Sequence, residues 1–220
     1  MRDVAPPIIV AIDGPAAAGK GTLARRLAEA LGLAYLDTGT IYRAVAARLL
    51  AHGGDPDDGE AALAAAHALT GGDLQRPELR TEPVSQAASR VSANQAVRAA
   101  LLELQRHFAH HPPAGAHGTV LDGRDIGTVV CPEACAKLFV TATTEERARR
   151  RHEELRARGA ERIYADVLRE MEARDQRDAA RDAAPLKPAG DAVVLDTSNR
   201  DVDAAFATAL EAVRRRCPGS

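Results

Sequence analysis

Residues Gly14 to Thr22 form the feature that most constrains the fold of this chain. They read Gly14, Pro15, Ala16, Ala17, Ala18, Gly19, Lys20, Gly21, Thr22 and fit the pattern G-x-x-x-x-G-K. In such a loop the glycines let backbone N–H groups turn inward around phosphate oxygens, and the lysine places a point charge on the outer phosphates. The alternative is an ordinary glycine turn, so the elements predicted on either side decide between the two interpretations.

A predicted strand precedes this loop and a predicted helix follows it. The continuous apolar run at 8–12 is typical of a strand buried on both faces. Leu23, Leu27 and Leu31 then recur at helical spacing, and Gly32 closes that helix as a C-terminal cap. Strand, loop and helix therefore stand in the order that a phosphate-binding loop, or P-loop, requires.

Strands and helices continue to alternate along the chain. Further strands are predicted at 34–36, 119–121, 137–141 and 192–195, and helices at 41–50, 61–69, 85–107, 144–158, 163–181 and 202–216. This alternation indicates βαβ crossovers and a parallel sheet flanked by helices, which is an α/β fold of the P-loop NTPase type. Stretches rich in Gly, Pro and Asp at 53–60 and 71–83 indicate a small appendage beside the sheet.

Composition narrows the class of protein. A chain of 220 residues is long enough for one sizeable core, so we expect a single domain with small lobes. A net charge of −2 argues against general binding of nucleic acid or anionic lipid. Without a membrane-length apolar run or a signal-peptide pattern at 1–10, we expect a cytoplasmic protein. Cys131, Cys135 and Cys217 form an odd set without paired CxxC units, and we predict three free thiols.

A second polar motif runs from Asp122 to Thr128, directly after the strand predicted at 119–121. Ligands of open α/β sheets bind beyond the carboxyl ends of strands, which is where this motif stands. Asp122 suits the hydration shell of Mg²⁺, and Arg124 suits a phosphate through its planar fork. The alternative interpretation is a polar turn with a surface salt bridge.

Two groups of charged residues lie on predicted helices. Arg174, Asp178 and Arg181 share one helix face, and Arg147, Arg150 and Arg151 crowd the start of another helix. Each group alone is typical of a solvated charged face. Phosphoryl transfer favours a functional interpretation, because positioned cations and a metal supply most of its catalysis.

The ending of the P-loop points to a narrower class. Gly21 stands where Ser or Thr usually follows the lysine, and the hydroxyl comes one residue later, at Thr22. This G-K-G-T ending is the variant found in nucleoside monophosphate kinases. The chain resembles the bacterial cytidylate kinase family in five stretches, at 10–32 around the P-loop, 36–43 (LDTGTIYR), 87–91 (AASRV), 121–130 (LDGRDIGTVV) and 174–186 (RDQRDAARDAAPL).

The resemblance implies an ATP-dependent, Mg²⁺-assisted phosphorylation of CMP and dCMP to CDP and dCDP by a monomer. It also implies one P-loop kinase domain with a core at 1–37, 108–143 and 182–220, a monophosphate-binding lobe at about 38–107, and a lid with its following helix at about 144–181. The chain departs from the family at 71–80, where many members carry a longer insert rich in β-strand. The lobe is therefore expected to be trimmed.

Residue roles carry over from the same resemblance. ATP would be held by Gly14 to Thr22 with Arg147 and Arg151, and Mg²⁺ by Thr22 and Asp122. The CMP phosphate and sugar would be met by Thr38, Tyr42, Arg43, Arg124, Arg174 and Asp178, and cytosine would be read by Ser89, Arg98 and Asp125. Catalysis would rest on Lys20, Arg124, Arg150, Arg174 and Arg181, the last of which also contacts the substrate.

Two other functions stay open at this point. An AMP or UMP kinase shares the P-loop but should lack the set Ser89, Arg98 and Asp125. A regulatory or RNA-binding module could use the arginine-rich helix, and it would show salt-sensitive RNA affinity without turnover.

Overall fold

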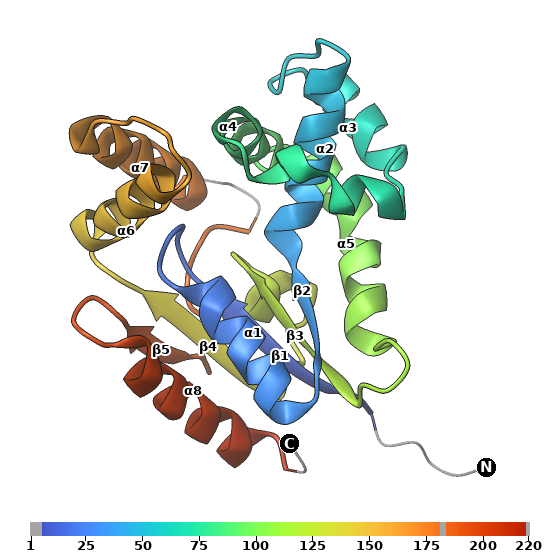
Figure 1. The fold of residues 1–220 in the computed structure, drawn as a ribbon. Helices are drawn as coiled ribbons and strands as arrows, with labels where there is room; N and C mark the ends of the chain where they lie inside the picture. Colours follow the sequence, from blue (N-terminus) through green and yellow to red (C-terminus); the bar gives the residue numbers. More distant parts are fainter. Residues whose placement is uncertain (1–5, 181–183, 219–220) are drawn as a thin grey trace. The chain divides into compact units, whose positions relative to one another are not determined.

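A five-stranded sheet carries the fold in the computed structural model, which describes residues 6–180 and 184–218. The strand order is β2-β3-β1-β4-β5 (Figure 1). The strands are β1 (Ile8–Asp13), β2 (Ala34–Asp37), β3 (Gly118–Gly123), β4 (Ala136–Thr141) and β5 (Val193–Asp196). β1 pairs in parallel with β3 and β4, and β4 pairs in parallel with β5. The predicted parallel sheet is therefore confirmed.

Two helices cover one face of this sheet, α1 (Lys20–Leu31) and α8 (Val202–Arg216). Val10 and Ile12 of β1 belong to a single apolar core, which also includes Val120 of β3, Leu138 of β4, Leu27 of α1 and Val213 of α8. Side chains alternate between the two faces of a strand, so Asp13 points to the face opposite this core. The leucines of α1, spaced four residues apart, are thus on the face of the helix that is buried against the sheet.

The register of β1 brings the ends of three strands together. Asp13, the last residue of β1, lies between Gly123 of β3 and Phe139 of β4. The segments that follow β1 and β3 therefore start side by side at the carboxyl edge of the sheet, where α/β proteins place their ligands, and β4 ends two residues beyond Phe139.

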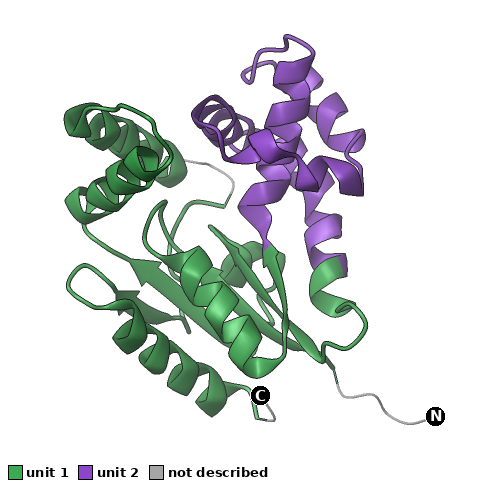
Figure 2. Ribbon diagram, viewed as in Figure 1, with its two compact units in different colours: residues 1–36, 108–220 green, residues 37–107 purple. Residues whose placement is uncertain are grey.

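The chain divides into two compact units, Met1–Leu36 with Phe108–Ser220, and Asp37–His107 (Figure 2). Unit 2 contains α2 (Thr38–Ala51), α3 (Gly59–His67), two short 3₁₀ turns η1 (Gly71–Gln75) and η2 (Pro77–Arg80), α4 (Glu82–Val91) and most of α5 (Gln95–His110). α2 packs against both α3 and α4. The segment at 71–80 forms 3₁₀ turns rather than strands, as its sequence led us to expect.

Unit 1 also carries a helix pair, α6 (Thr144–Ala157) and α7 (Tyr164–Ala179), which pack against each other. α6 begins after Thr143, whose side chain accepts a hydrogen bond from the N–H of Glu146. A five-residue π-helical turn, η3 (Ile126–Val130), follows β3. No helix in the described parts of the chain is both long and apolar enough to cross a bilayer.

Two predictions about the fold are wrong. The single helix expected at 85–107 is broken between Val91 and Gln95, because Asn94 accepts a hydrogen bond from the N–H of Val97 and so caps a new helix, α5.

Cys135 and Cys217 are not free thiols but form a disulfide that joins the start of β4 to the end of α8. They lie 82 residues apart in sequence, so spacing alone gave no sign of the pairing. Cys131 lies outside the disulfide and is buried.

Candidate active site

The P-loop leaves β1 through a glycine that no other residue can replace without distortion. Gly14 has a φ of +147°, and a Cβ at this position would lie 1.9 Å from the carbonyl oxygen of Val140. Gly19, with a φ of +90°, is the residue directly before α1. The loop is therefore a tight turn whose shape depends on two glycines at fixed places.

Lys20 is the first residue of α1 and is buried. Its Nζ donates to the carbonyl oxygen of Pro15 at 2.9 Å, so the ammonium group folds back onto the P-loop. Among the described residues, no side chain caps α1 at Gly19. The N-terminal N–H groups of α1 and the charge of Lys20 therefore make one electropositive end, which suits the oxygens of a phosphate chain.

Asp122 stands beside the P-loop at the end of β3, opposite Ile12 of β1. Tyr35 donates its hydroxyl to Oδ2 of Asp122 at 3.0 Å. A Cβ on Gly21 would lie 3.3 Å from the same oxygen, closer than most side chains tolerate. The glycine of the G-K-G-T ending thus makes room for this carboxylate next to α1.

These surroundings of Asp122 fit Mg²⁺. No group of three or more His, Cys, Asp or Glu side chains gathers as a metal cage anywhere in the described residues. Mg²⁺ does not need such a cage, since proteins usually bind it through one or two carboxylates and the phosphates of a nucleotide. Thr22 follows in the first turn of α1 and is exposed.

Asp13 is a residue of this site that the sequence analysis did not single out. Its Oδ1 accepts the N–H of Ile126 at 2.7 Å and its Oδ2 accepts the N–H of Gly127 at 2.8 Å. Burial raises the pKa of Asp13 to about 6, although these two N–H donors oppose the rise; the charge of Asp125 adds to it and that of Lys20 opposes it. An Asp at the end of the apolar run at 8–12 was the available sign, but its partners lie more than 110 residues further on.

Arg124 and Asp178 form a buried ion pair. Nε of Arg124 donates to Oδ2 of Asp178 at 2.8 Å, and the Asp178 side chain is only 2% exposed. Burial is the largest influence on the pKa of Arg124 and lowers it, but Asp178, Asp122 and Asp175 together outweigh burial and keep the pKa above its ordinary value. The alternative of a surface salt bridge is therefore wrong for Arg124. The structure brings Arg124 and Asp178 together, as expected for two residues of one site.

Of the two other site residues predicted in the α7 region, the structure describes Arg174 but not Arg181. Arg174 lies one turn before Asp178 on α7 and is half-buried. Arg181 lies outside the described residues.

Arg147 is buried at the start of α6 and links α6 to α7. Its guanidinium donates to both carboxylate oxygens of Asp175, at 3.0 and 2.5 Å, and to the carbonyl oxygen of Ala142 at 3.0 Å. A longer contact of 3.4 Å reaches the carbonyl oxygen of Ala16 in the P-loop. Arg147 therefore lies against the P-loop in this structure, held mainly by Asp175.

Arg150 reaches the other side of the P-loop, through a threonine that the sequence analysis missed. It donates to the side chain and the carbonyl oxygen of Thr197 at 3.0 and 2.6 Å, and Oγ1 of Thr197 lies 3.1 Å from the carbonyl oxygen of Ala18. Thr197 directly follows β5, but its type and position alone gave no sign of this role. Arg151 instead pairs with Glu154 on its own helix.

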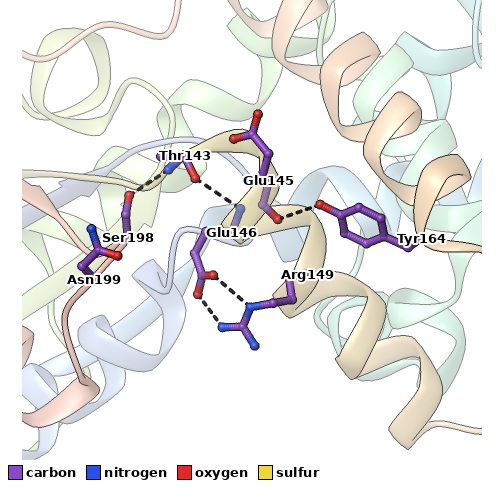
Figure 3. Close-up of a pocket in the computed structure, with 7 residues that line it drawn as sticks. All are labelled: Thr143, Glu145, Glu146, Arg149, Tyr164, Ser198 and Asn199. Carbon is purple, nitrogen blue, oxygen red and sulfur yellow. Dashed lines mark hydrogen bonds and ion pairs between the residues drawn. The ribbon is translucent and has the colours of Figure 1, made fainter.

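A cavity of about 380 Å³ adjoins Arg150, because Glu146 both lines it and accepts a hydrogen bond from Nε of Arg150. Figure 3 shows that Arg149 also points toward Glu146, so this carboxylate is shared by two arginines. The lining residues are Thr143, Glu145, Glu146, Arg149, Tyr164, Ser198 and Asn199. Each of these residues carries a polar side chain, so the cavity offers hydrogen-bonding groups to a ligand.

Within unit 2, the predicted substrate residues form two small groups. The guanidinium of Arg98 lies 5.8 Å from the ring centroid of Tyr42 and contacts the carbonyl oxygen of Ser92, and the Ser92 hydroxyl donates to the carbonyl oxygen of Ser89. These four residues come from α2, α4 and α5 and from the link between the last two. Tyr42, Ser89 and Arg98 are thus neighbours, although they are spread over more than 50 residues of sequence.

The second group stands at the start of α2. Arg43 donates to Oδ2 of Asp37 at 2.6 Å and to the hydroxyl of Thr40 at 2.9 Å. Its buried Nε has no hydrogen-bond partner within the part of the chain that the structure describes. Thr38 opens the same helix and is buried. A guanidinium whose Nε donor lacks an acceptor is well suited to an anionic ligand.

The fold and the P-loop site together define a class of protein. A buried strand leads into a glycine loop and a lysine, and an aspartate ends the adjacent strand, which is the arrangement of P-loop enzymes that transfer phosphoryl groups. The family model described as cytidylate kinase matches residues 10–215. The chain therefore belongs to the cytidylate kinase family.

Similar proteins agree with this assignment. The chain is 60% identical to a cytidylate kinase of Paramagnetospirillum magneticum over 92% of its own length and 95% of that protein. It is 58% identical to a cytidylate kinase of Rhodospirillum rubrum, with 93% and 96% covered, and 57% identical to one of Granulibacter bethesdensis, with 96% and 99% covered.

Solved structures resemble the fold alone. An uncharacterized protein from Eubacterium ventriosum matches with a TM-score of 0.55 and 15% identity, over 96% of this chain and 99% of that one. An unliganded sugar kinase from Janibacter matches with a TM-score of 0.50 and 16% identity, over 97% of each chain.

Proposed function

We propose that this protein transfers the γ-phosphoryl group of ATP to CMP and dCMP, giving ADP with CDP or dCDP. The observation that carries the proposal is the P-loop, in which Lys20 and the uncapped start of α1 face the same turn. The family membership supplies the acceptor, since the family model and the similar proteins are named cytidylate kinase.

The triphosphate of ATP would lie in the turn from Gly14 to Thr22, with its outer oxygens on Lys20 and on the N–H groups of α1. Arg147 donates to a carbonyl oxygen of this turn, and Arg150 donates to the carbonyl oxygen of Thr197 beside it. Either guanidinium would turn one of these N–H groups toward the transferring phosphoryl group. When bound, Mg²⁺ would lie near Asp122 and Thr22 and would neutralise charge on the outer phosphates.

The phosphate of CMP would be met by arginines whose acceptor partners already orient them. Asp178 holds Nε of Arg124, and a longer contact of 3.4 Å joins Nη1 to the carbonyl oxygen of Gly123, so the other donors of that guanidinium would serve a phosphate. In unit 2, Asp37 holds one end of Arg43 while Nε has a donor to spare. We propose that Thr38 and Tyr42 accompany Arg43, and that Arg174 and Asp178 contact the ribose.

Cytosine would be distinguished from uracil by the direction of its hydrogen bonds. A carboxylate such as Asp125 accepts from the exocyclic amine of cytosine, whereas uracil would present an acceptor to it. We propose that Ser89 and Arg98, which are neighbours in unit 2, serve the ring nitrogen and the carbonyl. An unpaired buried acceptor costs about 1–3 kcal/mol, which sets the scale of discrimination against UMP.

The chemistry we propose is direct in-line transfer without a covalent enzyme intermediate. Charge spreads over the transferring oxygens in the transition state, so the cationic groups Lys20, Arg124, Arg150, Arg174 and Arg181 would stabilise it, and no side chain needs to act as a nucleophile. We further propose that α6 and α7 form a lid that excludes water, so that ATP hydrolysis without CMP is slow.

We also infer that the enzyme is cytoplasmic and a monomer. Light scattering on the purified protein would test the oligomeric state.

Coupled assays of ADP release with CMP, dCMP, UMP and AMP would test the proposal. We expect CMP and dCMP to be preferred, and Lys20→Ala to lower kcat by on the order of 10²-fold or more. The exposed Lys187 offers a matched control, because Lys187→Ala removes the same charge outside the P-loop. Near-normal turnover by Lys20→Ala would contradict the proposal, and so would a preference for AMP or UMP. Salt-sensitive RNA binding without turnover would favour the alternative of a regulatory module.

A further inference from the structure

Asp13 connects the P-loop to the segment that carries Arg124 and Asp125. It is the last residue of β1 and directly precedes Gly14, where the P-loop starts. Through its two carboxylate oxygens it also holds the N–H groups of Ile126 and Gly127. One side chain therefore joins two segments that are more than 100 residues apart in sequence.

The chemistry of this contact requires an aspartate. Two adjacent N–H donors point at the same side chain, and a carboxylate meets both because each of its oxygens accepts. An asparagine would offer one acceptor and would turn an NH₂ group against the second N–H donor. The side chain is only 4% exposed, so water has little access to replace the lost acceptor.

Besides Asp13, the segment is fixed by the buried Ile126 and by one short turn, in which the carbonyl oxygens of Asp125 and Ile126 accept backbone N–H groups of the residues at 129–131. Asp125, just before the two bonded N–H groups, has a φ of −146° and a ψ of 26°, which belong to neither strand nor helix. The π-helical turn η3 follows with only five residues. A Cβ on Gly127 would lie 3.4 Å from Oδ2 of Asp13 and 3.1 Å from Cδ of Lys137, so the backbone of the segment packs closely on both side chains.

We propose that Asp13 is a positioning residue, which fixes Arg124 and Asp125 relative to the P-loop by holding the N–H groups of Ile126 and Gly127. The inference rests on the proposed function for the roles of Arg124 and Asp125. It adds that the geometry of the CMP-binding side of the site depends on the carboxylate of Asp13, which we propose contacts neither ATP nor CMP. A rearranged segment would misplace those two groups, and small misplacements of catalytic groups are costly.

The competing explanation is that Asp13 is only a structural residue of the interior. In that case its replacement would change the stability of the protein, and the folded fraction would keep its kinetic constants. A positioning role makes a different prediction, because the kinetic constants of the folded enzyme must change. The values for CMP should change more than those for ATP, since the segment that Asp13 holds carries the acceptor residues.

The experiment compares Asp13→Asn with Asp58→Asn in the full chain. Asp58 is a matched control, because its exposed carboxylate also accepts two backbone N–H groups, those of Glu60 and Ala61, as the cap of α3. Asn caps helices about as well as Asp, so Asp58→Asn should behave as wild type. Two readouts are taken well below the unfolding temperature, namely kcat and KM for CMP and ATP, and amide hydrogen exchange across residues 122–131 without ligand.

For Asp13→Asn we expect kcat/KM for CMP to fall on the order of 10- to 100-fold, with a smaller change in KM for ATP and faster exchange in that segment. Unchanged exchange together with kcat/KM within about 2-fold of wild type would overturn the inference. If Asp13→Asn does not fold, the smaller Asp13→Ser gives the same comparison. Failure of the wild type to phosphorylate CMP would count against the proposed function only, because the exchange comparison needs no substrate.

Discussion

The ionisation of Asp13 should leave a measurable mark on stability. Its carboxyl has an ordinary pKa of 3.8 in the unfolded chain, and burial raises the pKa to about 6 in the folded protein. Between these values the folded state binds more protons than the unfolded state. The free energy of unfolding contributed by this group is therefore fully present below about pH 4 and is lost as the pH rises through 6.

The magnitude follows from the two pKa values. The rise from 3.8 to about 6 corresponds to about 3 kcal/mol between strongly acidic and neutral conditions. At pH 5 about 1 kcal/mol of this is present, and at pH 7 almost none. Ionised Asp13 therefore makes the folded protein less stable at neutral pH than a protonated group at this place would.

Urea unfolding of wild type and Asp13→Asn at pH 7 and pH 5 tests this reasoning. Other carboxyls and the seven histidines titrate in both proteins, so their contributions cancel in the difference between the two. We expect wild type to gain about 1 kcal/mol relative to Asp13→Asn on going from pH 7 to pH 5. A difference that stays constant, or one that changes in the opposite direction, would refute a raised pKa at Asp13.

Three further predictions concern neighbouring groups. Gly14→Ala places a methyl group 1.9 Å from a carbonyl oxygen of β4, so the P-loop must move; we expect ATP affinity to be lost, as isothermal titration would measure, and retained affinity would contradict the geometry. Asp178→Ala leaves the charge of Arg124 buried without its partner, and we expect a loss of about 3–5 kcal/mol in urea unfolding; a loss below about 1 kcal/mol would mean that the pair is solvated. Cys135→Ser opens a disulfide loop of 82 residues to Cys217; we expect a loss of up to about 4 kcal/mol of stability in oxidising buffer, seen as a lower Tm with kcat unchanged, whereas equal Tm values would mean that the disulfide does not form.

The parts of the fold that local patterns control could be predicted from the sequence. Apolar runs of strand length gave all five strands, and the central strands β1 and β3 are buried almost throughout, whereas β2 and β5 at the edges of the sheet are partly exposed. The glycines at 14 and 19 predicted the P-loop correctly, because the backbone at both positions has a positive φ that favours glycine. The break before α5 was missed, since Asn94 acts as a cap only if the chain turns there.

The candidate site was predicted less evenly, for a physical reason. Motifs that are contiguous in sequence, such as the P-loop and the segment from Asp122 to Thr128, showed their chemistry directly. Contacts between distant segments did not. Thr197 is the partner of Arg150 only because β5 ends beside the P-loop, and the disulfide of Cys135 forms only because α8 ends near the start of β4.

Asp13 is the most informative of the missed residues, because stability alone does not explain it. Its carboxylate is buried, and the desolvation that raises its pKa outweighs the two N–H bonds that favour its charge. A neutral side chain of similar size would avoid that cost at neutral pH. Asp13 nonetheless stands where the P-loop begins and holds the segment of Arg124 and Asp125. A group that costs stability while it fixes the geometry of two functional segments is expected at an active site rather than in a core. The same reasoning predicts that Asp13→Asn can be as stable as wild type at pH 7 and still be a poorer enzyme.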